Sequence, residues 1–340
     1  MSATKPYLLI TGATGFIGSS LVHYFDKMPY YRVIATGRSE TKGKLFTSTG
    51  ILFQPADLTK ERDLINLSIK PDLIVHTAGF AAPWGLKRVF YEHNVVLTKN
   101  LLEYALRKSV NRFIYISSSS IYSSLSHQFN VTEDQLPKKF VNHYAESKYQ
   151  AEQCVLEAGK KGLPVIILRP RAVIGAGDTT ILPRLIQAHK HGRLRKISQS
   201  VILSDITTIT NLIEAVRLSL SSTSSATGKT FNITDGKPVL LWTMIDELLR
   251  ELKFPPLKGE LSWPMALAIS SASEFVSKLL NREPALPRYV VSLLGRSLTL
   301  NIEKARNLLH YNPVQTTEQG VSDYIRYYRN QNYDHHGRKS

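Results

Sequence analysis

The segment Thr11-Gly-Ala-Thr-Gly-Phe-Ile-Gly18 constrains the fold more than any other part of the sequence. It follows a short apolar run at 7–11, which predicts a strand, and it opens a stretch at 16–26 with helical spacing. Glycines at such a strand-to-helix turn let the backbone approach a pyrophosphate, and the helix N-terminus supplies N–H groups. The structural alternative is a tight turn that only needs small residues. We expect a dinucleotide site formed by Gly12, Thr14, Gly15, Phe16, Ile17 and Gly18.

The first half of the chain alternates apolar runs with helical patterns. Strands that alternate with amphipathic helices form a parallel sheet covered on both faces. The sequence therefore predicts an α/β fold: a Rossmann-type doubly wound parallel sheet with a smaller, mostly helical C-terminal substrate domain. The further predicted strands are 32–36, 72–76, 112–116 and 164–168, and the predicted helices include 94–108 and 144–158.

The pattern loosens after residue 170, and prolines interrupt the helical patterns of the second half. We predict an NAD(P)-binding domain at 1–170, with about 201–234 returning to it. A substrate-binding lid domain would take 171–335, and 336–340 would be a polar tail.

The charge and the cysteine content of the chain exclude several classes of partner and of structural site. Among 340 residues, 43 Lys and Arg against 27 Asp and Glu give a net charge of +16, which favours contact with anions. No helix-turn-helix or aromatic RNA-binding pattern is visible, so we expect no nucleic-acid partner. The single cysteine, Cys154, excludes a disulfide framework, and the histidines have no metal-ligand spacing, so we expect no metal. With no signal peptide and no membrane span in the sequence, we expect a cytoplasmic protein.

The end of the second predicted strand bears on cofactor choice. NAD-binding proteins usually place an acidic residue here to bind the ribose 2′-hydroxyl. This chain has Gly37 and then Arg38, and a guanidinium attracts a 2′-phosphate. We expect NADP in preference to NAD; a solvated loop charge is the structural alternative.

The segment Tyr144-Ala-Glu-Ser-Lys148 places a phenol and an ammonium on one face of a predicted helix. A nearby ammonium favours the phenolate and brings the tyrosine towards the range of a general acid or base. The serine run 117–120 follows a predicted strand and could hydrogen-bond a substrate oxygen beside the phenol. An exposed helix and a polar turn are the structural alternatives.

The sequence resembles the extended short-chain dehydrogenase/reductase superfamily, because it has the glycine turn, the serine run and the Tyr-x-x-x-Lys segment in this order. The resemblance covers about residues 6–328 and implies a general acid/base at Tyr144, a cofactor-binding Lys148 that lowers the tyrosine pKa, a catalytic Ser118, and Asn94 as support for a proton-relay water. It also implies cofactor contacts from Asp57, Leu58, Thr77, Ala78, Gly79, Tyr144, Lys148, Pro170 and Val173.

Segments of the second half, such as 231–239 and 294–299, resemble the 3β-hydroxysteroid dehydrogenase-like branch, including bacterial sterol dehydrogenases and 2-alkyl-3-oxoalkanoate reductases. This implies a small apolar carbonyl or alcohol substrate, steroid-like or long-chain acyl, with a 3-oxo or 3-hydroxy group. Thr208, Thr210 and Ala176 depart from the branch pattern. A nucleotide-sugar epimerase stays open because the basic run 184–196 could bind a diphosphate, and a non-catalytic NADP sensor is a second alternative.

Residues 265–279 form an amphipathic pattern followed by basic residues. Its apolar stripe either packs inside the lid domain or lies on an anionic membrane surface, which would make the protein peripheral to a membrane. The resemblance also implies a homodimer formed through the two helices that flank the central sheet.

Overall fold

The computed structural model describes residues 5–197, 201–280 and 282–337. Its main feature is a seven-stranded, wholly parallel sheet in the order β12-β7-β5-β4-β1-β2-β3. The strand order reverses between β1 and β4, which is the doubly wound topology that the sequence predicted. The strands are β1 (Tyr7–Thr11), β2 (Arg32–Gly37), β3 (Leu52–Pro55), β4 (Leu73–His76), β5 (Arg112–Ile116), β7 (Val165–Pro170) and β12 (Lys229–Ile233).

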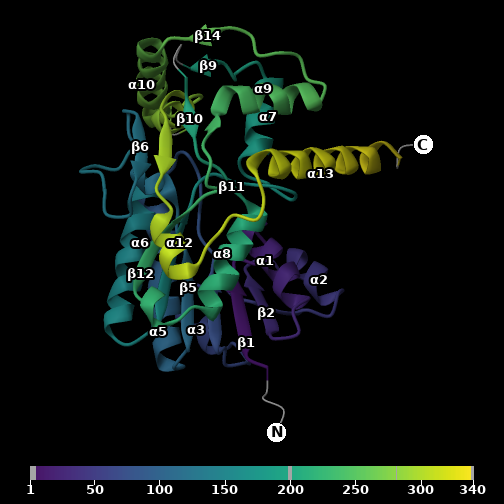
Figure 1. Ribbon diagram of the computed structural model, residues 1–340, viewed down its shortest axis with the longest axis vertical. Helices are drawn as coiled ribbons and strands as arrows, with labels where there is room; N and C mark the ends of the chain where they lie inside the picture. The colour runs from purple at the N-terminus through teal and green to yellow at the C-terminus, as the bar shows by residue number, and fades with distance from the viewer. Residues whose placement is uncertain (1–4, 198–200, 281, 338–340) are drawn as a thin grey trace.

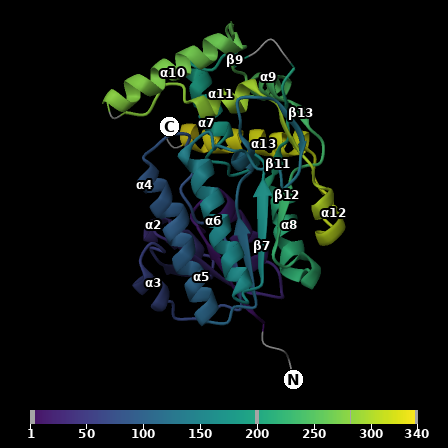
Figure 2. The same ribbon diagram turned by 90° about the vertical axis from the view of Figure 1, so that its left-hand side faces the viewer.

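Helices cover both faces of this sheet (Figures 1 and 2). Their apolar stripes and the two sides of the strands form two separate cores. One face carries α1 (Phe16–Asp26), α2 (Glu40–Thr47), α8 (Ile209–Ser221) and α12 (Glu303–Leu309). The other carries α3 (Glu61–Ile65), α5 (Leu97–Arg107) and α6 (His143–Lys160).

The second half of the chain contributes to the main sheet as well. Strand β12 pairs with β7 at one edge, and α8 packs against α1. Residues 302–311 also pack on this face, through Ile302, Ala305 and Tyr311. Local sequence patterns do not predict β3 or β12 as strands.

A second layer lies beyond the carboxyl ends of the main strands (Figure 1). Its helices enclose two further cores. They are α7 (Leu182–Lys190), α9 (Leu241–Glu251), α10 (Trp263–Leu280), α11 (Arg288–Gly295) and α13 (Thr317–Gly337). Helix α13 therefore continues two residues into the predicted tail, and 338–340 lie outside the described residues.

Small sheets join the two layers. A four-stranded mixed sheet in the order β13-β10-β15-β6 pairs β6 of the first half with β15 of the second. Its members are β6 (Gln128–Val131), β10 (Leu203–Ser204), β13 (Val239–Leu240) and β15 (Leu298–Leu300). Two parallel pairs complete the layer: β8 (Val173–Ile174) with β11 (Thr207–Thr208), and β9 (Lys196–Ile197) with β14 (Glu260–Leu261).

Helix α10 turns most of its large apolar side chains outward. Its buried residues are the small Ala266, Ser270 and Ser277. The interpretation in which the apolar stripe packs inside the lid is therefore wrong, because the helix meets the lid core through these small residues and through Trp263 and Leu267. The exposed residues are Met265 (53%), Ile269 (43%), Phe275 (65%), Val276 (49%), Leu279 (71%) and Leu280 (61%). Among the described residues, no helix combines the length and apolar character that crossing a bilayer needs.

Candidate active site

The glycine turn packs against the loop that follows β4. Gly12 has a φ of +66°, and a Cβ there would lie 2.7 Å from the backbone nitrogen of Ala78. A Cβ at Gly18 would overlap the carbonyl oxygen of Gly12. Thr77 reinforces the contact because its hydroxyl donates to the carbonyl of Thr11 at 2.6 Å. Only glycine fits at Gly12 and Gly18, because any side chain there would clash with the backbone. Glycine at position 12 therefore allows the ends of β1 and β4 to lie in direct contact.

The N-terminus of α1 is free to receive an anion. Its N-cap residue, Gly15, has no side chain to cap the first turn, and the first turn carries no acidic residue. A helix with uncapped N–H groups and a positive dipole end fits a pyrophosphate. Among the predicted contacts of this turn, Phe16 and Ile17 pack on the core below it.

The ends of β2 and β3 lie beside the same turn. A Cβ at Gly37 would come within 3.1 Å of the Thr14 hydroxyl. Arg38 is exposed, and it lies close enough to Asp57 to affect that carboxyl. Burial alone would raise the Asp57 pKa, but hydrogen bonds from Thr59 and the charges of Lys60 and Arg38 hold it below its usual range. The Arg38 guanidinium and the Asp57 carboxylate therefore lie near each other at the carboxyl ends of β2 and β3.

Other predicted cofactor contacts are distributed along the same edge. Ala78 donates its backbone N–H to the Thr11 hydroxyl, and a Cβ at Gly79 would lie 2.9 Å from the Asn94 side chain. Leu58 and Val173 are buried in the cores, and Pro170 is the last residue of β7.

A buried histidine connects the two loops, a role that the sequence analysis did not assign. The His76 Nδ1 lies 2.7 Å from the Thr11 hydroxyl, and its Nε2 lies 3.0 Å from the Thr98 hydroxyl. Thr98 donates its one proton to the carbonyl of Asn94 at 2.6 Å, so it accepts from His76 Nε2–H. Burial, aided by the charge of Lys148, lowers the His76 pKa to about 3. The imidazole is therefore neutral at pH 7.

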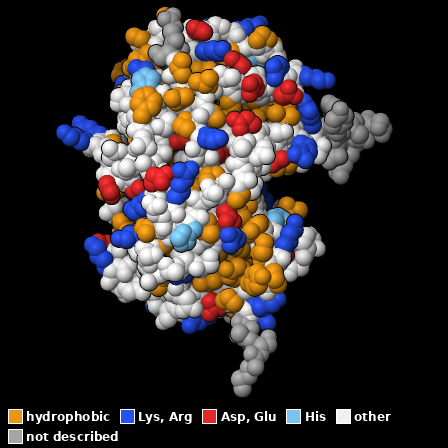
Figure 3. Space-filling model, viewed as in Figure 1, with side chains coloured by type: hydrophobic (Ala, Val, Ile, Leu, Met, Phe, Trp, Pro, Cys, Tyr) orange, Lys and Arg blue, Asp and Glu red, His pale blue; other side chains and the backbone are white. Residues whose placement is uncertain are grey.

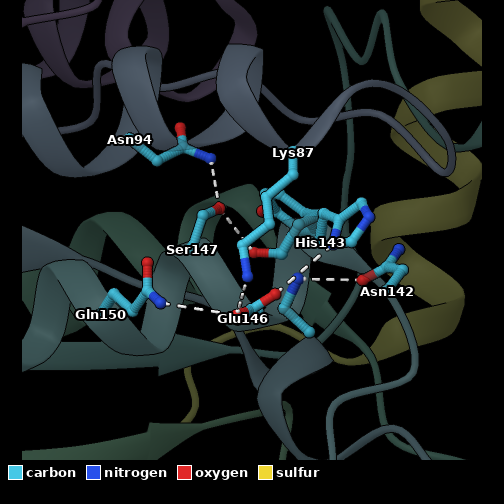
Figure 4. A network of polar contacts seen from close by, with 9 residues as sticks. Lys87, Asn94, Asn142, His143, Glu146, Ser147 and Gln150 are labelled. Atoms are coloured by element: carbon cyan, nitrogen blue, oxygen red, sulfur yellow. Dashed lines mark hydrogen bonds and ion pairs between the residues drawn. The ribbon is translucent and has the colours of Figure 1, made fainter.

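Asn94 lies in the π-helical turn η1 (Tyr91–Val96) that leads into α5, where it ties this turn to α6. Its Nδ2 donates to the Ser147 hydroxyl at 2.8 Å, as Figure 4 shows, and to the Phe80 carbonyl at 3.0 Å. Its Oδ1 accepts the Phe80 N–H at 2.7 Å. Both side-chain donors are thus committed within the protein, and Asn94 positions the Ser147 turn of α6.

Tyr144 lies in the first turn of α6 and meets the serine run after β5. Burial raises the pKa of the Tyr144 phenol, and the neighbouring Ser118 side chain offsets part of the rise. The helix begins here because Asn142 caps it, with its side chain accepting the Ala145 N–H at 2.9 Å.

Lys148 lies one turn further along α6 and is buried. Its ammonium donates to the carbonyl of Ile116 at 2.8 Å and lies 4.2 Å from the centre of the Tyr115 ring. Burial lowers its pKa to about 7, although the charge of Glu152 acts in the opposite direction. In this geometry the Lys148 ammonium is held to β5.

Tyr289, in α11, is a residue of this site that the sequence analysis did not identify. Burial raises the pKa of its phenol, and the neighbouring Tyr144 raises it further, while Arg171 lowers it. The lid helix α11 therefore places Tyr289 near Tyr144. The two tyrosines are 145 positions apart in the sequence, and no local pattern around residue 289 predicts that they are neighbours.

The profile of the NAD dependent epimerase/dehydratase family matches residues 8–234. The chain is 32% identical to the uncharacterized protein YbjS of Escherichia coli, over 92% of this chain and 95% of that protein. It is 28% identical to a decarboxylating sterol-4-alpha-carboxylate 3-dehydrogenase of Schizosaccharomyces pombe, over 92% and 95%. A 2-alkyl-3-oxoalkanoate reductase of Stenotrophomonas maltophilia is 27% identical, over 92% and 97%.

Among solved structures, the UDP-glucuronic acid 4-epimerase of Bacillus cereus, in complex with NAD, matches with a TM-score of 0.72. The two are 22% identical, and the match covers 96% of this chain and 99% of that one. At this identity the likeness shows the shared fold.

The buried His76 predicts a specific acid sensitivity. In the unfolded chain His76 has a pKa of about 6.5, so it is protonated below that pH, whereas in the folded chain it stays neutral down to a pH of about 3. The free energy of unfolding therefore decreases as the pH falls below about 6.5. Between pH 7.5 and 4.5 this costs about 3 kcal/mol. We expect His76→Gln to remove that loss from the pH dependence of urea unfolding. The exposed His23→Gln is the matched control, and identical pH slopes for wild type and His76→Gln would contradict the assignment.

Proposed function

The chain belongs to the NAD dependent epimerase/dehydratase family, and from that premise we propose that it is an NAD(P)-dependent oxidoreductase. It interconverts a 3-oxo and a 3-hydroxy group on an apolar substrate, steroid-like or long-chain acyl. The observation that carries the proposal is the placement of Tyr144 beside Ser118, whose side chain lowers the pKa of the phenol, one helical turn from a buried Lys148 at the end of the sheet that bears the glycine turn. Relatives named for 3-dehydrogenation and 3-oxo reduction support it.

The residues fit a nicotinamide cofactor, which when bound supplies or accepts the hydride at the carbinol carbon. The N-terminus of α1 would hold the pyrophosphate, and Lys148 would offer its two further N–H donors to ribose hydroxyls. In reduction, Tyr144 donates its phenolic proton to the carbonyl oxygen as Ser118 hydrogen-bonds the same oxygen. In oxidation, Tyr144 takes the proton from the alcohol. Hydroxyl partners favour the charged form of Lys148, which in turn lowers the Tyr144 pKa.

The proton-transfer role of Tyr144 is tested by Tyr144→Phe, with NADPH and 3-oxosteroids or 2-alkyl-3-oxoacyl compounds as substrates. We expect kcat to fall about 1000-fold because the general acid is lost, with NADPH affinity unchanged. Tyr149→Phe, on the same helix, is the matched control. Turnover that survives Tyr144→Phe would refute the mechanism, and turnover of nucleotide sugars alone would favour an epimerase.

We propose NADP as the preferred cofactor. Arg38 follows β2 directly, beside Thr14 of the glycine turn and Asp57 after β3. A guanidinium at that position binds a 2′-phosphate through charge-assisted hydrogen bonds. Asp57 remains available as an acceptor for the adenine amino group.

Arg38→Gln measures this preference directly. We expect the ratio of NADH to NADPH dissociation constants to fall by about 10-fold or more, mainly through weaker NADPH binding. Arg32→Gln, at the opposite end of the same strand, is the control. An unchanged ratio of the two dissociation constants would mean that residues other than Arg38 distinguish NADPH from NADH.

We also propose that α10 lies on an anionic membrane surface, from which an apolar substrate could enter. Its exposed apolar side chains form one face, and Lys278 and Arg282 lie exposed at its C-terminal end. Figure 3 shows apolar and basic side chains together at the end of the molecule where α10 lies in Figure 1. An apolar face bordered by cations is typical of a helix in the plane of an anionic leaflet.

Co-sedimentation with phosphatidylserine-containing vesicles at low salt tests this surface. We expect binding that Phe275→Glu with Leu279→Glu abolishes and that neutral vesicles reduce, because both the apolar face and the charge contribute. Leu45→Glu, at an apolar residue 70% exposed on α2, is the control. Absence of binding by the wild type would exclude membrane contact.

The homodimer inferred from the resemblance stays a prediction. Helices α5 and α6 lie side by side on one face of the sheet (Figure 2) and are the helices that would supply such an interface.

A further inference from the structure

Helix α6 meets a second helical segment at Tyr144. This segment runs from α4 (Lys87–Phe90) through η1 into α5, and both α4 and η1 pack against α6. Lys87, Phe90 and Asn94 follow one another at intervals of three and four positions, which places them near one face of a helix. All three contact the first two turns of α6, and their partners there are Tyr144, Glu146 and Ser147.

The inner end of this contact between the helices is a buried hydrogen bond, from Asn94 Nδ2 to the Ser147 hydroxyl at 2.8 Å. Phe90 lies one turn before Asn94 and is 1% exposed. The centre of its ring is 6.2 Å from the centre of the Tyr144 ring, and 5.1 Å from that of Phe80. The position of the Tyr144 ring therefore depends on where α4 holds Phe90.

The outer end of the contact is an ion pair. The Lys87 ammonium donates to Glu146 Oε1 at 2.7 Å, and the two side chains are 59% and 26% exposed (Figure 4). His143 Nδ1 lies 3.4 Å from the other carboxylate oxygen. Burial alone would raise the Glu146 pKa, but its hydrogen bonds with Lys87 and His143 hold it below its usual range. Glu146 is therefore ionised at pH 7 and attracts Lys87.

The same ion pair holds one end of an uncharged loop. Residues 79–86 follow β4 and contain no charged side chain. At the near end of the loop, Asn94 accepts the Phe80 N–H at 2.7 Å and donates to the Phe80 carbonyl at 3.0 Å. Lys87 is the first residue after the loop, so its pairing with Glu146 fixes the far end.

Two separate points of contact are needed to fix the orientation of one helical turn against another. The inner hydrogen bond alone cannot prevent α4 from pivoting about that point. The outer ion pair supplies the second point, and the Phe90 ring lies between the two along the chain. An exposed ion pair contributes little to the stability of the whole protein. Its effect is therefore local, on how closely α4 and Phe90 hold Tyr144.

We propose that Lys87 and Glu146 are positioning residues of the active site, which act on Tyr144 through Phe90. The inference rests on the proposed function and deepens it, because it adds two residues that act without contact to the reacting atoms. With the ion pair formed, the phenol is held where it can protonate the carbonyl oxygen. A displacement of about 1 Å is enough to slow a reaction by up to about 100-fold. Loss of the pair therefore lowers kcat and leaves NADPH binding at α1 unchanged.

The test follows NADPH oxidation with methyl 2-methyl-3-oxodecanoate, a 2-alkyl-3-oxoacyl ester. In Lys87→Met and in Glu146→Gln we expect kcat to fall about 5-fold, with the dissociation constant of NADPH within about 2-fold of the wild type. The double variant Lys87→Glu with Glu146→Lys restores kcat to within about 2-fold, because the attraction re-forms with the charges exchanged. A folding defect would not be rescued in this way.

Glu157 and Lys160 provide the matched control. They form an ion pair of the same length, 2.7 Å, in the last turn of the same helix. Glu157→Gln and Lys160→Met therefore retain the wild-type kcat. An unchanged kcat in Lys87→Met would overturn the inference. A double variant no better than the single variants would also overturn it, because the two residues would then act independently.

Hydrogen–deuterium exchange separates this test from the proposed reaction, because it needs no turnover. We expect the backbone amides of residues 86–92 to exchange about 5-fold faster in Lys87→Met, and at the wild-type rate in the charge-exchanged double variant. If the wild type reduces no carbonyl but exchange follows this pattern, the positioning pair stands and the proposed reaction fails. If exchange is equal in all variants, the pair does not hold α4, and the inference fails even where the enzyme is active.

Discussion

The direct contact between the loops that follow β1 and β4 is the constraint on which the site depends. Gly12 lies against Ala78 at a distance that excludes any Cβ, and the Thr11 hydroxyl bonds His76 from the adjacent strand end. From His76 the hydrogen bonds continue through Thr98 and Asn94 to Ser147 in α6. A neutral imidazole and two hydroxyls thereby position the helix that carries Tyr144 and Lys148 relative to the glycine turn.

Three buried cations lie along the same sheet edge, and each is treated differently by its surroundings. Arg169 is paired with Glu152 and serves the fold. Lys148 is held by a single carbonyl and an aromatic ring, with a pKa of about 7, and retains donors for a cofactor. In the part of the chain that the structure describes, Arg171 makes one side-chain hydrogen bond, to Ser204, and no ion pair. Of these three cations, Lys148 is the one whose remaining donors a bound dinucleotide would use.

Local sequence patterns predicted the elements whose structure depends on neighbouring residues in the chain. The glycine turn fixes β1 and α1, and a four-residue spacing is enough to place Tyr144 and Lys148 on one helix face. Strands β3 and β12 were missed because polar residues interrupt their apolar runs, with Gln54 in β3 and Thr230 and Asn232 in β12. The apolar stripe of α10 repeats with the period of a helix, and this period is the same whether the stripe faces the core or the solvent. The orientation of the helix is visible only from its buried residues, which are small and lie on the opposite side. The roles of His76 and Tyr289 arise from contacts between distant segments, which no spacing rule encodes.

The most direct test of the central claim is a crystal structure with NADP bound. This account predicts the pyrophosphate on the N-terminus of α1, the 2′-phosphate against Arg38, and a ribose hydroxyl within hydrogen-bonding distance of Lys148 Nζ. The nicotinamide would then lie beside the Tyr144 hydroxyl. A dinucleotide bound away from α1, or one whose nicotinamide end lies far from Tyr144 and Lys148, would contradict it.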